Sequence, residues 1–440
     1  FAMPHDVLPN SLENYWVPFT DNRGFKAEPR LISEASGNYM TDHRGGKIID
    51  GSSGLFCSPA GHCHPKIIEA VHAQMKRNTF TAPFGMSHDG GFMLADKVAQ
   101  LTPEGMNHTF FVNSGSEAID TALKIVMAYH SAKGRDRIRF VSRERAYHGV
   151  NIGGVSLSGM VNNRRTFPVT MPNVVMMRHT LTGDELNHAG QPLHGRELAN
   201  DLERACQTYG GETIAACFVE PIAGSTGVLV PPVGYLERLR EICDAHGILL
   251  VFDEVITGFG RTGQAFASQT YGVTPDIITM AKALTNGAIP MGAVAVRDEI
   301  YETVTNASPD NAIEFFHGYT YSAHPAACAA GIATQKIYEE DGLFQRAHDM
   351  SNYFLDAVWS LKDHPLVADL RGFGMMAGIE INHDGVGGRR GTQLQKDMFW
   401  NGLHVKFTGD NAILAPAFVA ERSHIDEIVD KFRKTLDQHL

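Results

Sequence analysis

The stretch GILLVFDEVITGFGRTG, residues 247–263, decides the fold together with PDIITMAKALTNG, residues 275–287. Each begins with a short apolar run that stops at a charged residue, Asp253 in the first and Lys282 in the second. Apolar runs of four to eight residues bounded by turn residues are typical of buried parallel strands. Because ligands of open α/β sheets bind just outside the carboxyl ends of the strands, we expect Asp253 and Lys282 to meet in one crevice.

A carboxylate and an amine at this edge of a sheet have two explanations. They could form an ion pair that closes two strand ends, or they could be the pair that pyridoxal phosphate requires. That cofactor needs a lysine with which to form a Schiff base and an aspartate that keeps its pyridine nitrogen protonated. Asp253 and Lys282 by themselves leave both explanations open.

The composition limits the class of protein. At 440 residues the chain exceeds the size at which a single hydrophobic core stops growing, so we expect two domains and allow a third. Hydrophobic content of 43% and charged content of 20% are typical of a soluble globular protein. A net charge of -11 without a lysine- or arginine-rich run argues against DNA or RNA as a partner.

The sequence predicts no membrane segment and no metal site. Its longest apolar stretches are far shorter than the roughly 18 to 20 residues of a membrane helix, and no secretory segment is apparent. Six cysteines in so long a chain do not form a disulfide framework, which predicts a cytoplasmic location. Cys57, His62, Cys63 and His64 fall together, but their spacing matches no zinc motif. We interpret this segment as a loop beside an active site.

A serine-rich turn follows a further predicted strand. Residues 108–112, HTFFV, read as the strand, and a helix begins after the turn from Asn113 to Ser116. Free amide groups and the helix dipole make such a start an anion site, to which Ser114 and Ser116 add hydroxyl donors. Serine is also an ordinary N-cap residue, and the P-loop pattern GxxxxGK(S/T) is absent, so the turn alone leaves phosphate binding open.

Two more predicted strands lead to polar residues. One precedes a loop with Tyr147 and His148, where an aromatic ring could stack on a planar ligand or belong to the core. The other, in TIAACFVE, ends at Glu220. Polar or reactive groups thus follow five strands in a region where strands alternate with helices. This pattern predicts an α/β fold with a mostly parallel sheet covered on both faces.

The rest of the chain predicts a second, smaller α+β domain. Residues 1–36 read as an irregular arm, GNYMTDHRGGKIIDGSSG as an antiparallel hairpin and residues 65–78 as a helix. We interpret NGAIPMGAVAVRDEIY as a strand pair, LRGFGMMAGIEI as a single strand and HVKFTGDNAILAPAF as a hairpin. The expected divisions are 1–60 for the arm and part of the small domain, 61–315 for the large domain, and 316–440 for the C-terminal small domain.

Several motifs in one order resemble those of a known family. NSGSEA, AYHG, VEP, FDEVITGFGRTG, MAKALTNG and HGYTYSAHP resemble the class III aminotransferases of pyridoxal phosphate fold type I, over nearly the whole chain. Within that family the likeness is to the ω-amino acid:pyruvate (β-alanine:pyruvate) transaminases. The resemblance implies a mostly parallel seven-stranded sheet with a smaller α+β domain, pyridoxal 5'-phosphate, and transfer of an amino group from an ω-amino acid or amine to pyruvate.

The resemblance also implies roles for individual residues. Lys282 matches the lysine that bonds to the cofactor, Asp253 the partner of the pyridine nitrogen, and Glu220 a carboxylate near the cofactor. The remaining matches are Tyr147 and Val255 on the two ring faces, Ser114, Gly115 and Ser116 around the phosphate, and Thr320 reaching the phosphate of the neighbouring subunit. The match at Thr320 implies a homodimer with shared active sites and leaves tetramers open.

The substrate side departs from the family pattern. Relatives carry an arginine that binds the carboxylate of the keto acid, where this chain has Lys406. Lysine is a point charge and lacks the bidentate fork of arginine, so Lys406 could bind the carboxylate more weakly. Alternatively, Arg389 or Arg390 could bind the carboxylate in its place, or the acceptor could differ. Lys406 could also have no role in binding and simply extend to solvent. Residues matching the amine pocket are Phe19, Phe84 and Phe56, the last at a position where tryptophan is frequent.

Three alternatives to an ω-transaminase remain open at this point. Taurine and diamine transaminases share the motifs, and so do decarboxylases and aminomutases, because fold alone does not determine function. A non-catalytic binding protein could also have kept the fold, although intact Lys282 and Asp253 argue against it. Product analysis would separate these possibilities.

Overall fold

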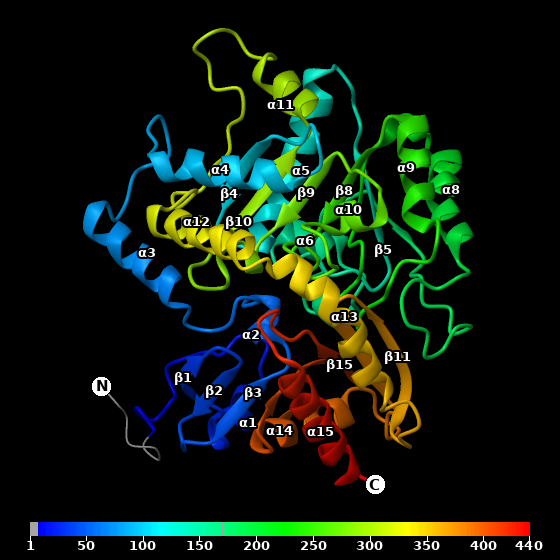
Figure 1. Cartoon of the computed structure of the whole chain (residues 1–440). Coiled ribbons are helices and arrows are strands. Elements are labelled where there is room, and N and C mark those ends of the chain that lie inside the picture. The colour runs from blue at the N-terminus through cyan, green and yellow to red at the C-terminus, as the bar shows by residue number, and fades with distance from the viewer. Residues whose placement is uncertain (1–7, 169) are drawn as a thin grey trace.

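A computed structural model describes residues 8–168 and 170–440, and its largest layer is a seven-stranded sheet (Figure 1). The strand order is β4-β10-β9-β8-β7-β5-β6. The strands are β4 (His108–Val112), β5 (Arg139–Arg143), β6 (Val174–Met177), β7 (Ile214–Val219), β8 (Leu249–Asp253), β9 (Ile277–Met280) and β10 (Gly292–Val296).

The large sheet is mostly parallel, as predicted. From β9 to β6 all neighbouring strands pair in parallel, whereas β10 runs antiparallel to both β9 and β4. The expectation of a strand pair in residues 286–301 was wrong, because GAVAV forms the single strand β10 and helix α11 follows it. Since β10 inserts between β4 and β9, both of its edges are paired and it needs no hairpin partner.

Helices cover both faces of the large sheet because successive strand residues point to opposite faces. In β7, Ala216 and Phe218 pack in the cluster that contains α5, whereas Cys217 and Val219 pack against α8 and α9. Strands β7 and β8 are buried over their whole length. This burial on both faces explains why the sequences of both strands are apolar up to Asp253 at the end of β8.

The longer helices begin and end at residues suited to those positions. His64 caps α3 by accepting a hydrogen bond from the Lys66 amide at 3.3 Å, and Gly247 ends α9 with a φ of 67°. These helices are α3 (Pro65–Arg77), α4 (Asp89–Leu101), α5 (Gly115–Ala132), α8 (Asn200–Tyr209), α9 (Tyr235–His246), α11 (Asp298–Thr305), α12 (Pro325–Glu340), α13 (Leu343–Trp359), α14 (Arg389–Trp400) and α15 (Arg422–Asp437). No helix in the described part of the chain is both long and apolar enough to cross a membrane.

Short helical turns connect these elements. They are α1 (Asn22–Ala27), α2 (Ser53–Phe56), α6 (Ile152–Leu157), α7 (Val161–Arg164), α10 (Ala267–Tyr271), and the 3-10 turns η1 (Arg196–Ala199), η2 (Gly211–Thr213) and η3 (Lys282–Thr285). The N-terminal arm is less irregular than expected, because α1 and strand β1 lie within it. Residues 1–7 of that arm fall outside the described residues.

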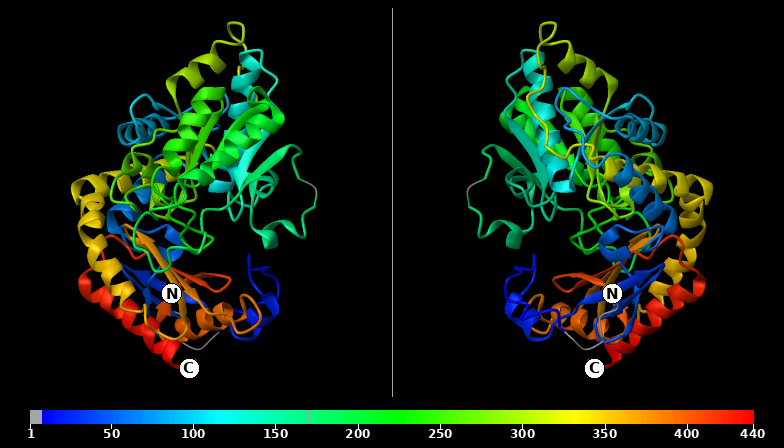
Figure 2. Two further views of the ribbon diagram at one scale, coloured as in Figure 1. Left: turned by 90° about the vertical axis from the view of Figure 1, so that its right-hand side faces the viewer. Right: turned by 90° about the vertical axis from the view of Figure 1, so that its left-hand side faces the viewer.

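Two smaller sheets lie together beneath the large one (Figures 1 and 2). The first has the order β1-β2-β3-β13, with β1 (Ile32–Ser36), β2 (Tyr39–Asp42), β3 (Lys47–Asp50) and β13 (Leu403–His404). The predicted hairpin of β2 and β3 is confirmed. Strand β3 also pairs in parallel with β13, which connects the N-terminal segment to the C-terminal part of the chain. The expected domain limits at 60/61 and 315/316 stay predictions.

The second small sheet corrects one expectation and confirms another. Its order is β11-β12-β15-β14, with β11 (Val367–Phe373), β12 (Met376–Ile381), β14 (Lys406–Thr408) and β15 (Asn411–Leu414). LRGFGMMAGIEI is not one strand, because Gly374, with a φ of 59°, turns the chain back between β11 and β12. The predicted hairpin after His404 is formed by β14 and β15.

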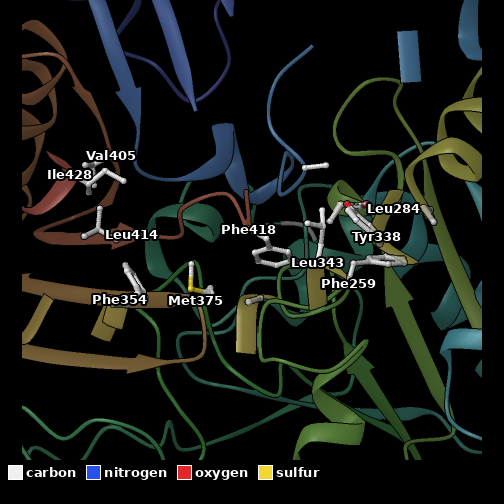
Figure 3. Packing of buried hydrophobic residues seen from close by; sticks show 14 of the residues in the cluster. Phe259, Leu284, Tyr338, Leu343, Phe354, Met375, Val405, Leu414, Phe418 and Ile428 are labelled. Carbon is white, nitrogen blue, oxygen red and sulfur yellow. Dashed lines mark hydrogen bonds between the residues drawn. The ribbon is translucent and has the colours of Figure 1, made fainter. Parts of the chain in front are cut away.

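One hydrophobic cluster continues from the large sheet into the small domain (Figure 3). Phe259 and Leu284 come from the large sheet region, Leu343 begins α13, and Phe354 and Phe418 continue the cluster toward the small sheets. Full burial of such side chains contributes about 1.5–3 kcal/mol each to stability. The shared core therefore fixes the small domain against the strand ends of the large sheet.

Candidate active site

A cavity of about 220 Å³ opens at the carboxyl ends of the central strands. Asp253 is the last residue of β8, Glu220 directly follows β7, and Lys282 follows β9 after Ala281. The residues predicted for the site that line this cavity are Gly115, Ser116, Tyr147, Glu220, Asp253, Val255 and Lys282. Parallel strands end at one edge of the sheet, so their final side chains meet there although they are far apart in sequence.

Asp253 is held by a histidine that the sequence reasoning did not select. His148 Nδ1 lies 2.8 Å from Asp253 Oδ2, and the Val255 amide donates to Asp253 Oδ1 at 3.2 Å. Because a carboxylate only accepts, Nδ1 carries the hydrogen. The His148 side chain is fully buried and that of Asp253 is 7% exposed, and both residues line the cavity, so the pair forms its buried floor. The signal for His148 was its place next to Tyr147 at a strand end.

Lys282 begins η3 in a left-handed conformation, with a φ of 46°. Its Nζ donates a hydrogen bond to the Leu55 carbonyl oxygen at 3.0 Å and lies 5.0 Å from the centre of the Phe56 ring. Burial lowers the pKa of the Lys282 amine, and Lys406 acts in the same direction, while Cys57 and Asp253 oppose the shift. A lowered pKa increases the fraction of neutral, nucleophilic amine at neutral pH.

Glu220 and Tyr147 form the next part of the wall. Glu220 Oε1 accepts a hydrogen bond from the Tyr147 amide at 3.1 Å, which fixes the loop after β5 to the end of β7. Burial raises the pKa of Glu220 to about 7, although His148 opposes the shift. Burial also raises the pKa of the half-buried Tyr147, so its phenol stays protonated at neutral pH.

The serine turn is an N-cap, and one of its serines faces the cavity, while phosphate binding stays a prediction. Ser114 is an N-cap whose hydroxyl accepts from the Glu117 amide at 3.1 Å, and it does not line the cavity. Ser116 does line the cavity, and its hydroxyl accepts from the Val150 amide at 3.0 Å. A side chain at Gly115 would come within 3.1 Å of Val255 Cγ2, so glycine lets the helix start lie close to Val255 without displacing it.

Five other residues predicted for the site, including Lys406, do not line this cavity. Thr320 is exposed, as are Phe19 and Phe84, with 78% and 64% of their surface accessible. Phe56 is buried and contacts the site through Lys282.

Lys406 begins β14 and is half-buried. Its amide donates to Ser52 Oγ at 3.0 Å, and among the described residues no carboxylate lies within ion-pair distance of its amine. Burial lowers its pKa. Arg389 and Arg390 are engaged elsewhere, with Asp384 and the Asn382 carbonyl respectively. Of these three cations, Lys406 is the one that acts on Lys282 electrostatically.

The histidines and cysteines at residues 57–64 have separate roles. His62 Nε2 lies 2.6 Å from Asp50 Oδ2, His64 caps α3, and Cys63 is exposed. Across residues 8–168 and 170–440, no group of three or more histidine, cysteine or acidic side chains is arranged to hold a metal ion.

The cavity has the groups that pyridoxal phosphate needs. A buried carboxylate, a half-buried amine, an aromatic side chain and a glycine-containing helix start all line it. A phosphate fits the free amides of a helix start, and a pyridine nitrogen fits a carboxylate. The residues that line the cavity therefore fit pyridoxal phosphate, and this fit is typical of enzymes that transfer groups through a bound organic cofactor.

The chain belongs to the class-III aminotransferase family, because the family model described as Aminotransferase class-III matches residues 21–436. The resemblance inferred from the motifs is confirmed, and the protein is an aminotransferase. It is 48% identical over 437 residues to "Omega-aminotransferase" of Caulobacter vibrioides, covering 98% of this chain and 99% of the relative. It is 43% identical over 431 residues to "Beta-alanine--pyruvate aminotransferase" of Pseudomonas aeruginosa, covering 97% and 96%.

Solved structures of similar proteins confirm the fold. The omega transaminase from Pseudomonas jessenii in complex with PMP has a TM-score of 0.92 and 31% sequence identity, covering 100% of this chain and 98% of that one. The predicted fold class, a mostly parallel seven-stranded sheet with a smaller α+β domain, is therefore confirmed.

Proposed function

We propose that the protein is a pyridoxal 5'-phosphate-dependent transaminase that moves the amino group of an ω-amino acid or amine, β-alanine-like, to pyruvate. The products are an aldehyde or keto acid and L-alanine. The observation that carries the proposal is the meeting of the Lys282 amine and the Asp253 carboxylate in one cavity. The names of the relatives from Caulobacter vibrioides and Pseudomonas aeruginosa support the substrate class.

Asp253 is the residue that would keep the pyridine nitrogen of the cofactor protonated. The cofactor supplies an electron sink for the electrons left behind when a proton leaves the substrate carbon. The hydrogen bond from His148 Nδ1 to Asp253 Oδ2, at 2.8 Å, orients the carboxylate. Asp253 would therefore be the partner of the ring nitrogen and would keep on it the proton that the electron sink requires.

Lys282 carries the proton that is transferred. Its Nζ removes a proton from the substrate carbon and returns one as general base and acid. Burial lowers the pKa of Lys282 toward the operating pH, which suits a group that must accept and release a proton in each cycle.

The remaining residues bind and orient. The α5 start with Gly115 and Ser116 would hold the phosphate, and Tyr147 and Val255 would contact the two ring faces. The exposed Thr320 would complete the phosphate site of a second subunit, which makes the enzyme a homodimer with shared active sites. Exposed Phe19 and Phe84 suit burial against that second subunit. Six unpaired cysteines favour a reducing, cytoplasmic location.

The test of this function is spectroscopic and chemical. Purified protein is expected to be yellow, to lose the colour with a good amine donor, and to regain it with pyruvate. A donor screen with β-alanine, taurine, diamines and aryl amines identifies the amine, and a screen of pyruvate, 2-oxoglutarate and glyoxylate identifies the acceptor. Protein that binds no cofactor would end this proposal, and release of carbon dioxide without alanine would favour a decarboxylase.

Lys406 is the residue proposed to bind the carboxylate of the keto acid. Replacing it with arginine is expected to lower KM for pyruvate by roughly fivefold, equivalent to about 1 kcal/mol for one additional hydrogen bond. Lys406→Ala is expected to raise KM for pyruvate with little effect on aryl amines that lack a carboxylate. Steady-state kinetics measure both, with exposed Lys362→Arg as the control. An unchanged KM for pyruvate in both Lys406 variants would remove the residue from this role.

A further inference from the structure

Two nucleophilic side chains share one carbonyl oxygen beside the cavity. Cys57 Sγ donates to the Leu55 oxygen at 3.2 Å, and Lys282 Nζ donates to the same oxygen at 3.0 Å. Each of the two groups also shifts the pKa of the other. The thiol is therefore next to the amine on which the proposed chemistry depends.

The two chain segments that carry these groups are fixed to one another. Asn286, on the turn that follows Lys282, accepts from the Ala60 amide and donates to the Gly61 oxygen, both at 2.9 Å. A side chain at Gly287 would come within 2.8 Å of Cys57 Cβ, so the backbones are in close contact. A bond between Cys57 and Lys282 thus needs motion of the long lysine side chain rather than of either backbone.

Both members of this pair are partly accessible to solvent. Leu55 is 46% exposed and lines the cavity together with Lys282, and Cys57 is half-buried. Of the other five cysteines, Cys63 is exposed and the rest are buried. Oxidation by a small peroxide is therefore expected at Cys57 and Cys63, and only Cys57 has the amine beside it.

We propose that Cys57 is a modification site at which hydrogen peroxide links it reversibly to Lys282. Peroxide converts the thiol to a sulfenic acid, forming an S–O bond and releasing one water. The neutral Lys282 amine then attacks the sulfur, an S–N bond forms, the S–O bond breaks, and a second water leaves. Sulfur is oxidised, peroxide is reduced, and the protein loses two hydrogen atoms. Two equivalents of a small thiol reverse the link and become a disulfide.

The protonation states of the two groups favour attack by the Lys282 amine and disfavour oxidation of the Cys57 thiol. Burial lowers the pKa of Lys282, which keeps the attacking amine neutral. Burial raises the pKa of the Cys57 thiol, although Lys282 opposes the shift, so the reactive thiolate is scarce at neutral pH. The consequence for catalysis rests on the proposed function: a linked Lys282 cannot bond to the cofactor or move a proton. A cofactor bonded to Lys282 should in turn protect it from Cys57.

Peptide mapping tests the link directly. Purified enzyme is incubated with L-alanine, which frees Lys282, or with pyruvate, which returns it to the cofactor, and both samples then receive hydrogen peroxide. The expected result with L-alanine is loss of the free Lys282 peptide and appearance of one cross-linked to the Cys57 peptide, reversed by dithiothreitol. The pyruvate sample should keep its free Lys282 peptide. The matched variants are Cys57→Ser, which should give no link, and Cys63→Ser, which should still give it.

The outcomes separate this proposal from the proposed function. Equal linking in both samples would support the site while counting against cofactor attachment at Lys282. Oxidation of Cys57 to sulfinic or sulfonic acid without a cross-link in either sample would overturn the proposal, as would a link that survives in folded Cys57→Ser.

Discussion

Replacing Lys282 with alanine is expected to lower kcat by on the order of 10⁴-fold, the upper range for removal of a positioned general acid and base. The alanine variant also lacks the amine that would bond to the cofactor. Its absorbance should therefore be that of a non-covalently held aldehyde, and borohydride should no longer fix cofactor to the chain. The fold should persist, because Lys282 makes one side-chain hydrogen bond, to Leu55.

The measurements for Lys282→Ala are single-turnover rates, absorbance spectra and circular dichroism. Exposed Lys362→Ala is the matched control, since it removes a lysine from the small domain without touching the cavity. Lys282→Arg keeps the charge but not the accessible neutral amine, so it should be nearly as inactive as alanine. Turnover close to that of the unchanged enzyme in folded Lys282→Ala would remove the lysine from its proposed role.

Asp253→Asn is the second change with a large expected effect. Asparagine keeps the size of the side chain but cannot hold a proton on the pyridine nitrogen, so kcat is expected to fall by about 10²- to 10³-fold, as for loss of one preorganised electrostatic group. The cofactor should remain bound through its phosphate and Lys282. The affected step should be proton removal from the substrate carbon, which a deuterium isotope effect on that carbon would report.

The control for Asp253→Asn is Asp363→Asn, at an exposed position before β11. His148→Gln provides an independent check, because it disturbs the 2.8 Å contact to Asp253 without removing the carboxylate. It should slow turnover less than Asp253→Asn does. If Asp253→Asn kept both the rate and the isotope effect of the unchanged enzyme, the nitrogen-partner role would belong to another group.

Local patterns were enough to predict the strands and their polar ends. Residues 249–253, 277–280 and 214–219 are mostly apolar runs, and each is a buried strand of the large sheet. Since parallel strands end at one edge, the grouping of Asp253, Glu220 and Lys282 followed from their positions alone. The family motifs added the likeness that the comparison with known relatives confirmed.

Local patterns failed where pairing depends on distant residues. GAVAV reads as half of a hairpin, yet β10 inserts between β4 and β9 because both flanking strands supply partners for its edges. The turn at Gly374 was missed because glycine inside an alternating run also occurs within strands. His148 was passed over because periodicity does not reveal which of two adjacent residues at a strand end points toward the sheet.

The sequence by itself determined the fold class, the family and the set of strand-end residues, because hydrophobic period and turn chemistry are local properties. Only the tertiary structure decided what those residues touch. It placed His148 beneath Asp253, and it brought Leu55 and Cys57 against Lys282 across a separation of more than two hundred residues. These contacts depend on how the N-terminal segment and the small domain pack on the sheet, and that packing is set by a shared core rather than by any local signal.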